Sequence, residues 1–306
     1  MLPDLFFTIN YWVVIGLSII TLTLSLLIIV IIITHRECYN CTHLLTCNTC
    51  VAVIVYFIFR VIESIYALRG DWQYHQPACV FRAYCLVGIT AALCYSFSIQ
   101  AISRLFFTVL YKYKFLLTWR THWILIMINW VISAIIPIEP LLLNGFDLRT
   151  ESRNCAVSMK IASVSLYTGA LVFIIPLNMV TIIYGIILYQ VHQSTRRVAL
   201  ATSEITAGAP HHKLLGTNGK REIKIMRNMS IQTTILLFGG ILSSVVEIWN
   251  AVGQGSPPES FYLLSFQLIS VFTTFMMITL FLMDNSVRKI ALSYIYRNPG
   301  TNNQYL

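Results

Sequence analysis

Seven long apolar segments constrain the fold of this chain more than any other feature. A helix needs roughly 20 predominantly apolar residues to cross a hydrocarbon core about 30 Å thick, because its rise is about 1.5 Å per residue. The sequence meets this requirement at about 11–34, 44–68, 79–110, 122–143, 161–190, 225–250 and 261–283. It therefore predicts an all-α membrane protein, a seven-transmembrane helix bundle.

The composition excludes a soluble globular domain. The chain is 57% hydrophobic and 11% charged, whereas soluble domains are roughly 45–50% apolar and about 25% charged. Its net charge of +9 comes from basic residues that lie between apolar segments, so no nucleic-acid partner is predicted. Anionic membrane lipids and a cytoplasmic protein are the expected partners of these residues. No enzyme activity, cofactor or metal is predicted.

The basic residues also predict the orientation, because Lys and Arg are translocated poorly. If the N-terminus is outside, most of the 21 basic residues lie in cytoplasmic loops. We therefore expect a multi-pass plasma-membrane protein with a short extracellular N-terminus, 1–10, and the bundle at 11–283. Residues 284–306 should form an amphipathic cytoplasmic helix and tail, with an apolar stripe made by Val287, Ile290, Ala291, Tyr294 and Ile295.

Cys79 and Arg104 lie at the two ends of the third segment, and a further cysteine follows in an outer loop. Cys79 opens this segment on the outer side, and Cys155 lies in the second outer loop. Arg104 follows Cys79 by 25 residues, which corresponds to roughly 37 Å of helix. Cys79 and Arg104 are therefore expected at opposite ends of one helix.

The fourth and fifth segments contain three further residues that contribute to the pattern. Trp130 is inside the fourth, Pro176 interrupts the fifth, and Tyr184 follows eight residues later toward the cytoplasm. Together with the spacing of the outer cysteine and the inner arginine, this pattern resembles a rhodopsin-like G-protein-coupled receptor. The resemblance covers the whole chain, including the short helix after the seventh segment.

The resemblance implies roles for four residues. In such receptors the two cysteines form a disulfide that ties the outer loop to the third helix, which implies a Cys79–Cys155 bond here. The arginine helps to engage the G protein and the tyrosine moves toward it on activation. These roles fall on Arg104 and Tyr184.

Several motifs of the family are missing. Ser103 stands at the position of the acidic residue before the arginine, Leu105 at the position of the tyrosine after it, and Val53 at the position of the sodium-binding aspartate. The sixth segment has no Trp-x-Pro switch, and Met276–Leu280 takes the place of the Asn-Pro-x-x-Tyr box. These losses leave the predicted fold intact but remove the residues of the usual activation route.

A ligand pocket is predicted from polar residues near the outer ends of the spans, because charges at membrane depth usually face a cavity or each other. Its candidate residues are Arg60, Glu63, Arg82, Glu247, Tyr262 and Gln267. Alternatively, Arg60 and Glu63, three residues apart, pair with each other and serve the scaffold. Leu86 stands where amine receptors carry an aspartate, so a small peptide or a polar chemosensory ligand is favoured.

The predicted function is a receptor that binds an extracellular ligand and activates a heterotrimeric G protein. A non-signalling decoy or scaffold would keep the fold and lose the switches. A transporter is less consistent with the sequence, which shows no paired inverted repeats. A zinc site made by Cys38, Cys41, Cys47 and Cys50 is disfavoured, because the two pairs are too close together in the sequence.

Overall fold

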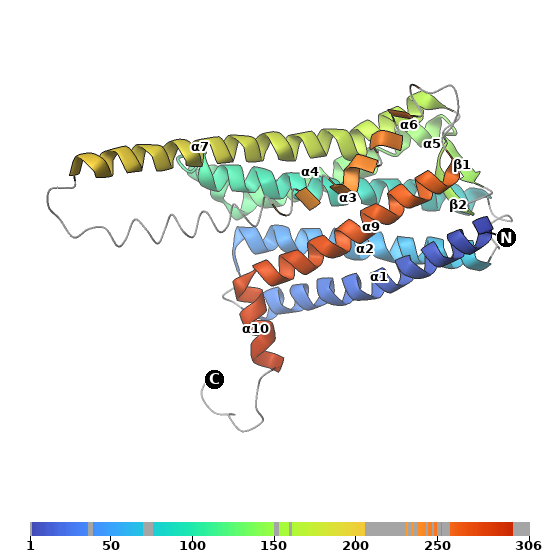
Figure 1. Cartoon of the computed structure of the whole chain (residues 1–306), viewed down its shortest axis with the longest axis horizontal. Helices are drawn as coiled ribbons and strands as arrows, with labels where there is room; N and C mark the ends of the chain where they lie inside the picture. The colour runs from blue at the N-terminus through green and yellow to red at the C-terminus, as the bar shows by residue number, and fades with distance from the viewer. Residues whose placement is uncertain are drawn as a thin grey trace.

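The computed structural model describes residues 2–35, 39–69, 76–149, 153–158, 161–205, 231, 234–235, 238–242, 244–246, 248–249, 252 and 258–295. Its long helices run side by side in an elongated bundle (Figure 1). We call the end that carries a β-hairpin the outer end, and the end at which the last helix begins the inner end, following the predicted orientation. The elements are α1 (Leu2–Thr34), α2 (Cys41–Arg69), α3 (Gln76–Thr108), η3 (Lys114–Leu117), α4 (Trp119–Ile135), α5 (Ile138–Leu142), β1 (Phe146–Arg149), β2 (Asn154–Val157), α6 (Ala162–Gly169), η4 (Ala170–Ile174), α7 (Ile175–Ile205), α9 (Glu259–Met283) and α10 (Asn285–Ile295).

Six helical segments of the described chain are long and apolar enough to cross a membrane. They match the first to fifth and the seventh of the predicted spans. Most of the sixth predicted span, 225–250, lies outside the described residues, and the residues described between 231 and 249 are helical. The six are Leu5–Thr34, Cys41–Arg69, Pro77–Thr108, Trp119–Leu142, Ala162–Gln190 and Leu263–Met283.

The first helix shows how the bundle distributes its side chains. Ser18, Thr21 and Ser25 are fully buried, whereas Ile19 and Ile20 are exposed. This inversion of the soluble pattern suits a bilayer, where small and hydroxyl side chains let helices approach and large aliphatic ones face lipid. The Thr21 hydroxyl makes a 2.8 Å hydrogen bond with the hydroxyl of Thr274, which joins α1 to α9.

The third helix is the centre of the bundle, since it packs against α2, α4 and α7. α1 closes the other side by packing against α2 and α9. Trp130, in the fourth span, donates a 3.0 Å hydrogen bond from its indole N–H to the side-chain oxygen of Asn48, so it ties α4 to α2. The family's tryptophan thus has a structural role in this position.

The first helix begins at Leu2, about two and a half turns before the start at residue 11 that the sequence predicted. The reason is that apolar residues continue toward the N-terminus, and Pro3 is compatible with a first helical turn. Phe7 and Tyr11 are buried against Ala67 and Leu263 at the outer end. The start of the chain is therefore packed on α2 and α9.

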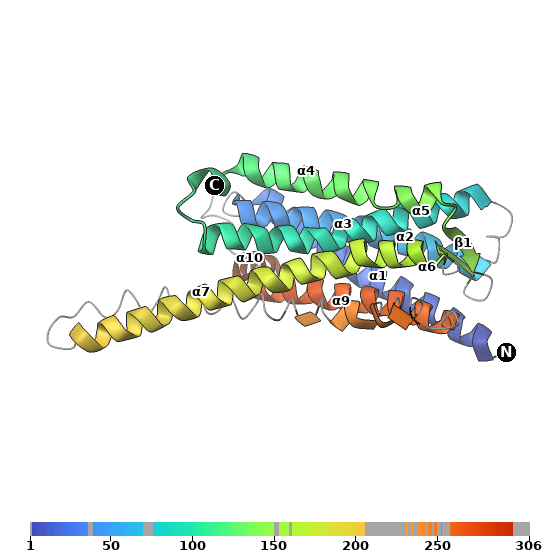
Figure 2. The same cartoon turned by 90° about the horizontal axis from the view of Figure 1, so that it is seen from above.

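The fifth span is interrupted where Pro176 follows a turn of π-helix, η4. Proline lacks an amide hydrogen and its ring crowds the preceding turn, so the regular bonding of an α-helix cannot continue through it. The Ser98 hydroxyl donates to the carbonyl of Pro176 at 3.2 Å, which joins α3 to this point of α7. Beyond Pro176, α7 extends past the other helices at the inner end in both views (Figures 1 and 2).

The second outer loop forms a small hairpin that the sequence did not predict. β1 and β2 pair antiparallel, with Leu148 opposite Cys155. A disulfide joins Cys155 to Cys79 at the outer end of α3, and both cysteines are buried beside Phe146. The predicted disulfide is therefore present, and it holds the hairpin over α3.

The amphipathic helix after the last span is confirmed as α10. The Asp284 carboxylate accepts hydrogen bonds from the backbone N–H groups of Ser286 and Val287, at 3.0 and 3.2 Å, and so caps its N-terminus. Val287 and Ala291 are buried, and Arg288 is exposed. The helix turns away from the bundle axis (Figure 1), as expected for a helix that lies along a membrane surface.

Candidate functional site

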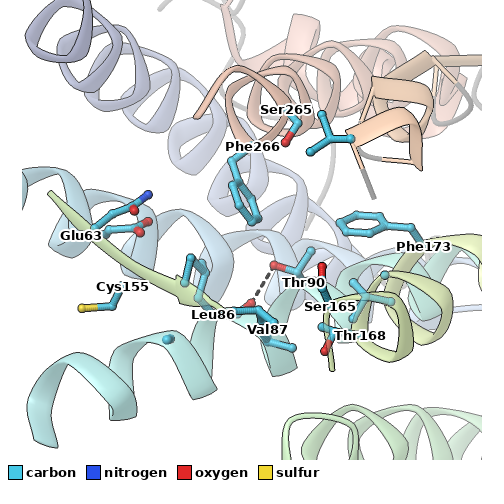
Figure 3. A pocket seen from close by; sticks show the side chains of 17 residues that line it. Glu63, Leu86, Val87, Thr90, Cys155, Ser165, Thr168, Phe173, Ser265 and Phe266 are labelled. Carbon is cyan, nitrogen blue, oxygen red and sulfur yellow. Dashed lines mark hydrogen bonds between the residues drawn. The ribbon is translucent and has the colours of Figure 1, made fainter. Parts of the chain in front are cut away.

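A pocket opens at the outer end between α2, α3, β2, α6, η4 and α9. It encloses about 760 Å³ of space between atoms, including its opening to solvent. Its walls are mostly aliphatic and aromatic, with hydroxyl groups from Thr90, Ser165 and Thr168. Figure 3 shows Glu63 at one end of this outer pocket and Phe173 at the other.

Glu63 is the member of the predicted set that lines the outer pocket. Its carboxylate accepts a hydrogen bond from Nη1 of Arg60, 2.5 Å away. Arg60 is only 1% exposed, and its Nε and Nη2 have no hydrogen-bond partner among the described residues. The guanidinium also lies 6.0 Å from the ring of Phe266. The two residues therefore form a buried ion pair, of which only Glu63 reaches the pocket.

The other predicted pocket residues lie around this pair or outside the described chain. The Arg82 guanidinium lies 4.1 Å from the centre of the Tyr66 ring, and Arg82 lines an outer recess together with Glu63. Gln267 is buried and donates a 3.1 Å hydrogen bond to the carbonyl of Asn10 in α1. Glu247 and the side chain of Tyr262 lie outside the described residues. A ligand role for the whole set stays a prediction.

At the inner end of α3, Ser103 occupies the family's acidic position and turns toward α4. Its hydroxyl lies 2.9 Å from Nε2 of His122, which is fully buried. The other ring nitrogen of His122 lies 2.9 Å from the carbonyl of Thr118. A carbonyl only accepts, so Nδ1 carries a proton, and the Ser103 hydroxyl is the hydrogen-bond partner of Nε2. Ser103, which stands at the position of the family's acidic partner of the arginine, is thus hydrogen-bonded to His122.

Arg104 therefore has a different electrostatic environment. Tyr184 and Asp284 lie close enough to act electrostatically on its guanidinium. Tyr184 is partly buried against a cluster that contains Ala101 and Val180. The structure thus brings together the two residues that were predicted to engage the G protein, one from α3 and one from α7.

Asp284 connects three elements at the inner end. Besides capping α10, its carboxylate lies 3.0 Å from Nε2 of His43 in α2. Burial raises the pKa of the Asp284 carboxyl, but the hydrogen bonds from His43, Val287 and Ser286 outweigh this effect and hold the pKa below its ordinary value. The group is therefore ionised at neutral pH. It supplies a negative charge at the end of the bundle where Arg104 lies.

Sequence reasoning missed the pairs Ser103–His122 and His43–Asp284, because it did not establish which faces of different helices meet. A signal for the second pair was present, since both residues lie at helix ends on the predicted cytoplasmic side. Within the described part of the chain, no cluster of three or more His, Cys, Asp or Glu residues is arranged to hold a metal ion.

Comparison with known families gives one match. Residues 25–283 match the family described as the 7 transmembrane receptor (rhodopsin family). No match to a curated protein was found. The matched range includes the whole of 225–250, so the fold is the seven-transmembrane bundle of this family. The described spans and the disulfide from α3 to the outer loop agree with that match. The chain therefore belongs to the rhodopsin family of seven-transmembrane receptors.

Proposed function

We propose that this receptor binds an extracellular ligand in the outer pocket and activates a heterotrimeric G protein at its inner end. It would do so in the plasma membrane, with the N-terminus outside and the C-terminus in the cytoplasm. The observation that supports this best is that α3 and the η4–α7 helix each contribute to both ends. Thr90 and Phe173 line the pocket, and Arg104 and Tyr184 lie together at the inner end.

A mechanism follows from these shared helices. A ligand that packs better against one arrangement of η4 and α3 than against another shifts the balance between the two. The π-turn and Pro176 interrupt the regular bonding between the pocket and Tyr184, so α7 can change its tilt there at low cost. A change in tilt would move Tyr184 relative to Arg104 and open a crevice for the G protein.

The pocket also narrows the choice of ligand. The sequence favoured a small peptide or a polar chemosensory ligand. Backbone groups of a peptide need hydrogen-bond partners when buried, and the described pocket walls offer a few hydroxyls, Asn154 and Glu63 among many apolar side chains. A small chemosensory molecule with one polar end fits these walls better than a peptide.

The test is agonist-independent activation of G proteins in cells, compared at equal surface expression. Arg104→Ala should lower basal activation by about tenfold, the effect of losing roughly 1.4 kcal/mol of coupling. Arg120→Ala is the matched control, because Arg120 is an exposed arginine at the same end, at the start of α4. A wild-type chain silent toward every G-protein class would support the non-signalling decoy or scaffold, whereas basal activity that persists unchanged in Arg104→Ala would remove Arg104 from the coupling site.

A further inference from the structure

A second cavity lies deeper in the bundle, below the outer pocket. It comprises about 530 Å³ of space between atoms, including its opening to solvent, and is lined by residues of α3, η4, α7, the sixth span and α9. Its walls are almost entirely apolar, including Leu93, Phe97, Ile269 and Phe272. We call it the lower cavity. Gly240, in the described part of the sixth span, also lines it and contributes no side chain to fill it.

The two cavities are stacked along the bundle and meet at Phe173, which lines both. On α3 the outer pocket is lined by Leu86 and Thr90, and the lower cavity by Leu93 and Cys94. From Leu86 to Cys94 is roughly 12 Å along the helix axis. Phe173 belongs to the π-turn η4. Phe173 therefore lies at the boundary between an outer space with hydroxyl groups and an inner apolar space.

A recess beside the outer pocket carries charged side chains. Among the described residues it is lined by Glu63, Arg82 and Arg153, and it shares Leu86, Asn154 and Cys155 with the pocket. Glu63 is already paired with Arg60. Within this described lining of the recess the arginines therefore outweigh the carboxylate. A guanidinium has the planar geometry that matches a carboxylate.

These features together specify a ligand. Building on the receptor function proposed above, we propose that the ligand is an amphipathic anion with a carboxylate head and an unbranched hydrocarbon tail. The head binds at Arg82 and Arg153, and the tail passes through the outer pocket and beyond Phe173 into the lower cavity. A polar tail would leave its groups without partners in the lower cavity, and a positively charged head would meet the arginines of the recess.

The proposal predicts how binding depends on chain length. The probes are straight-chain carboxylates from about butanoate to about tetradecanoate, and alkylamines of the same lengths, added to the full-length receptor in nanodiscs. Each added methylene should raise carboxylate affinity about fourfold, until the end of the lower cavity is reached. Amines of equal length should bind more weakly. Partition into lipid favours longer chains in both series, so it produces neither the length limit nor a preference for the carboxylate.

Two variants test the position of the hydrocarbon tail, because they should change the limiting chain length in opposite directions. Gly240→Val should shorten the longest chain that still gains affinity, because a Cβ at Gly240 meets only Leu177 Cδ2, at 3.5 Å, and the added methyls occupy cavity space. Phe97→Leu should lengthen it. Gly185→Val is the matched control, because a Cβ at Gly185 meets nothing within 4 Å, and its length limit should equal that of the wild type.

A third variant tests the head. Arg82→Gln should weaken carboxylates of all lengths by about tenfold, roughly one charge-assisted hydrogen bond, without changing the length limit. The proposal is overturned by a length limit that neither Gly240→Val nor Phe97→Leu shifts, or by equal binding of amines and carboxylates. Because binding is measured without a G protein, a receptor that shows the predicted length limit but activates no G protein would overturn the signalling function and keep the ligand assignment.

Discussion

Arg60 carries a charge that is almost completely buried within the bundle. Glu63 is its ionic partner among the described residues, and two of its N–H groups have no hydrogen-bond partner there. Removing one member of a buried pair strands the other, whereas replacing both with apolar residues often costs little. The three-residue spacing suggested this pair from the sequence. The contact of Arg82 with Tyr66 could not be inferred in the same way, because it joins two helices.

Substitutions in the Arg60–Glu63 ion pair test whether the pair stabilises the fold. Glu63→Gln should destabilise the receptor by about 3–5 kcal/mol, because it leaves the Arg60 charge uncompensated. The double variant Arg60→Leu/Glu63→Leu should recover most of that stability. Both are measured as melting temperatures of the purified protein in detergent. A single variant that melts with the wild type would show that the ion pair contributes little to the fold.

Asp284 gives a prediction for pH. Its folded-state pKa is lowered, so the stabilisation by its carboxylate is fully present above the unfolded value, about 3.9. It is lost as the pH falls through the folded value. The wild type should therefore melt higher than Asp284→Asn at pH values between about 5 and 7, and this difference should disappear below about 3.9. Melting curves of both proteins across this range are the measurement. A difference already gone near pH 6 would contradict the assignment.

At the scale of elements, the sequence located the helices well and the outer hairpin not at all. A membrane-spanning helix has one required length and composition, so apolar segments reveal it directly. The strands β1 and β2 have four residues each, and they form because the disulfide and the packing over α3 hold them in place. The early start of α1 has a similar cause, since Phe7 and Tyr11 find partners on α2 and α9.

The disulfide should contribute to folding and surface expression, because it holds the hairpin whose strand β2 lines the outer pocket. It closes a loop across 76 residues of sequence, and such a bond contributes about 2–5 kcal/mol. Cys79→Ser and Cys155→Ser should each lower surface expression, and the double variant should be no worse than either single one. Cell-surface labelling measures this. Additive losses would mean that each cysteine acts through contacts other than the bond.

For the whole molecule, the predicted orientation has a direct test. The distribution of basic residues places the N-terminus outside and the segment at about 200–220 inside. An epitope tag at the N-terminus should be labelled on intact cells, and a tag in this segment only after permeabilisation. Labelling of the inner tag on intact cells would reverse every assignment of outer and inner ends.

The far end of α7 lies a long way from the interruption at Pro176. Ile205 lies 29 residues beyond Pro176 in the same helix, which is roughly 44 Å at the helical rise. A rigid arm of this length that pivots by about 5° at the proline moves its far tip by roughly 4 Å, whereas Tyr184, eight residues from the pivot, moves by only about 1 Å. In the proposed mechanism, a small rearrangement around Phe173 moves the far end of α7 more than the bundle, so a partner bound at that end would be displaced further than one that contacts the bundle.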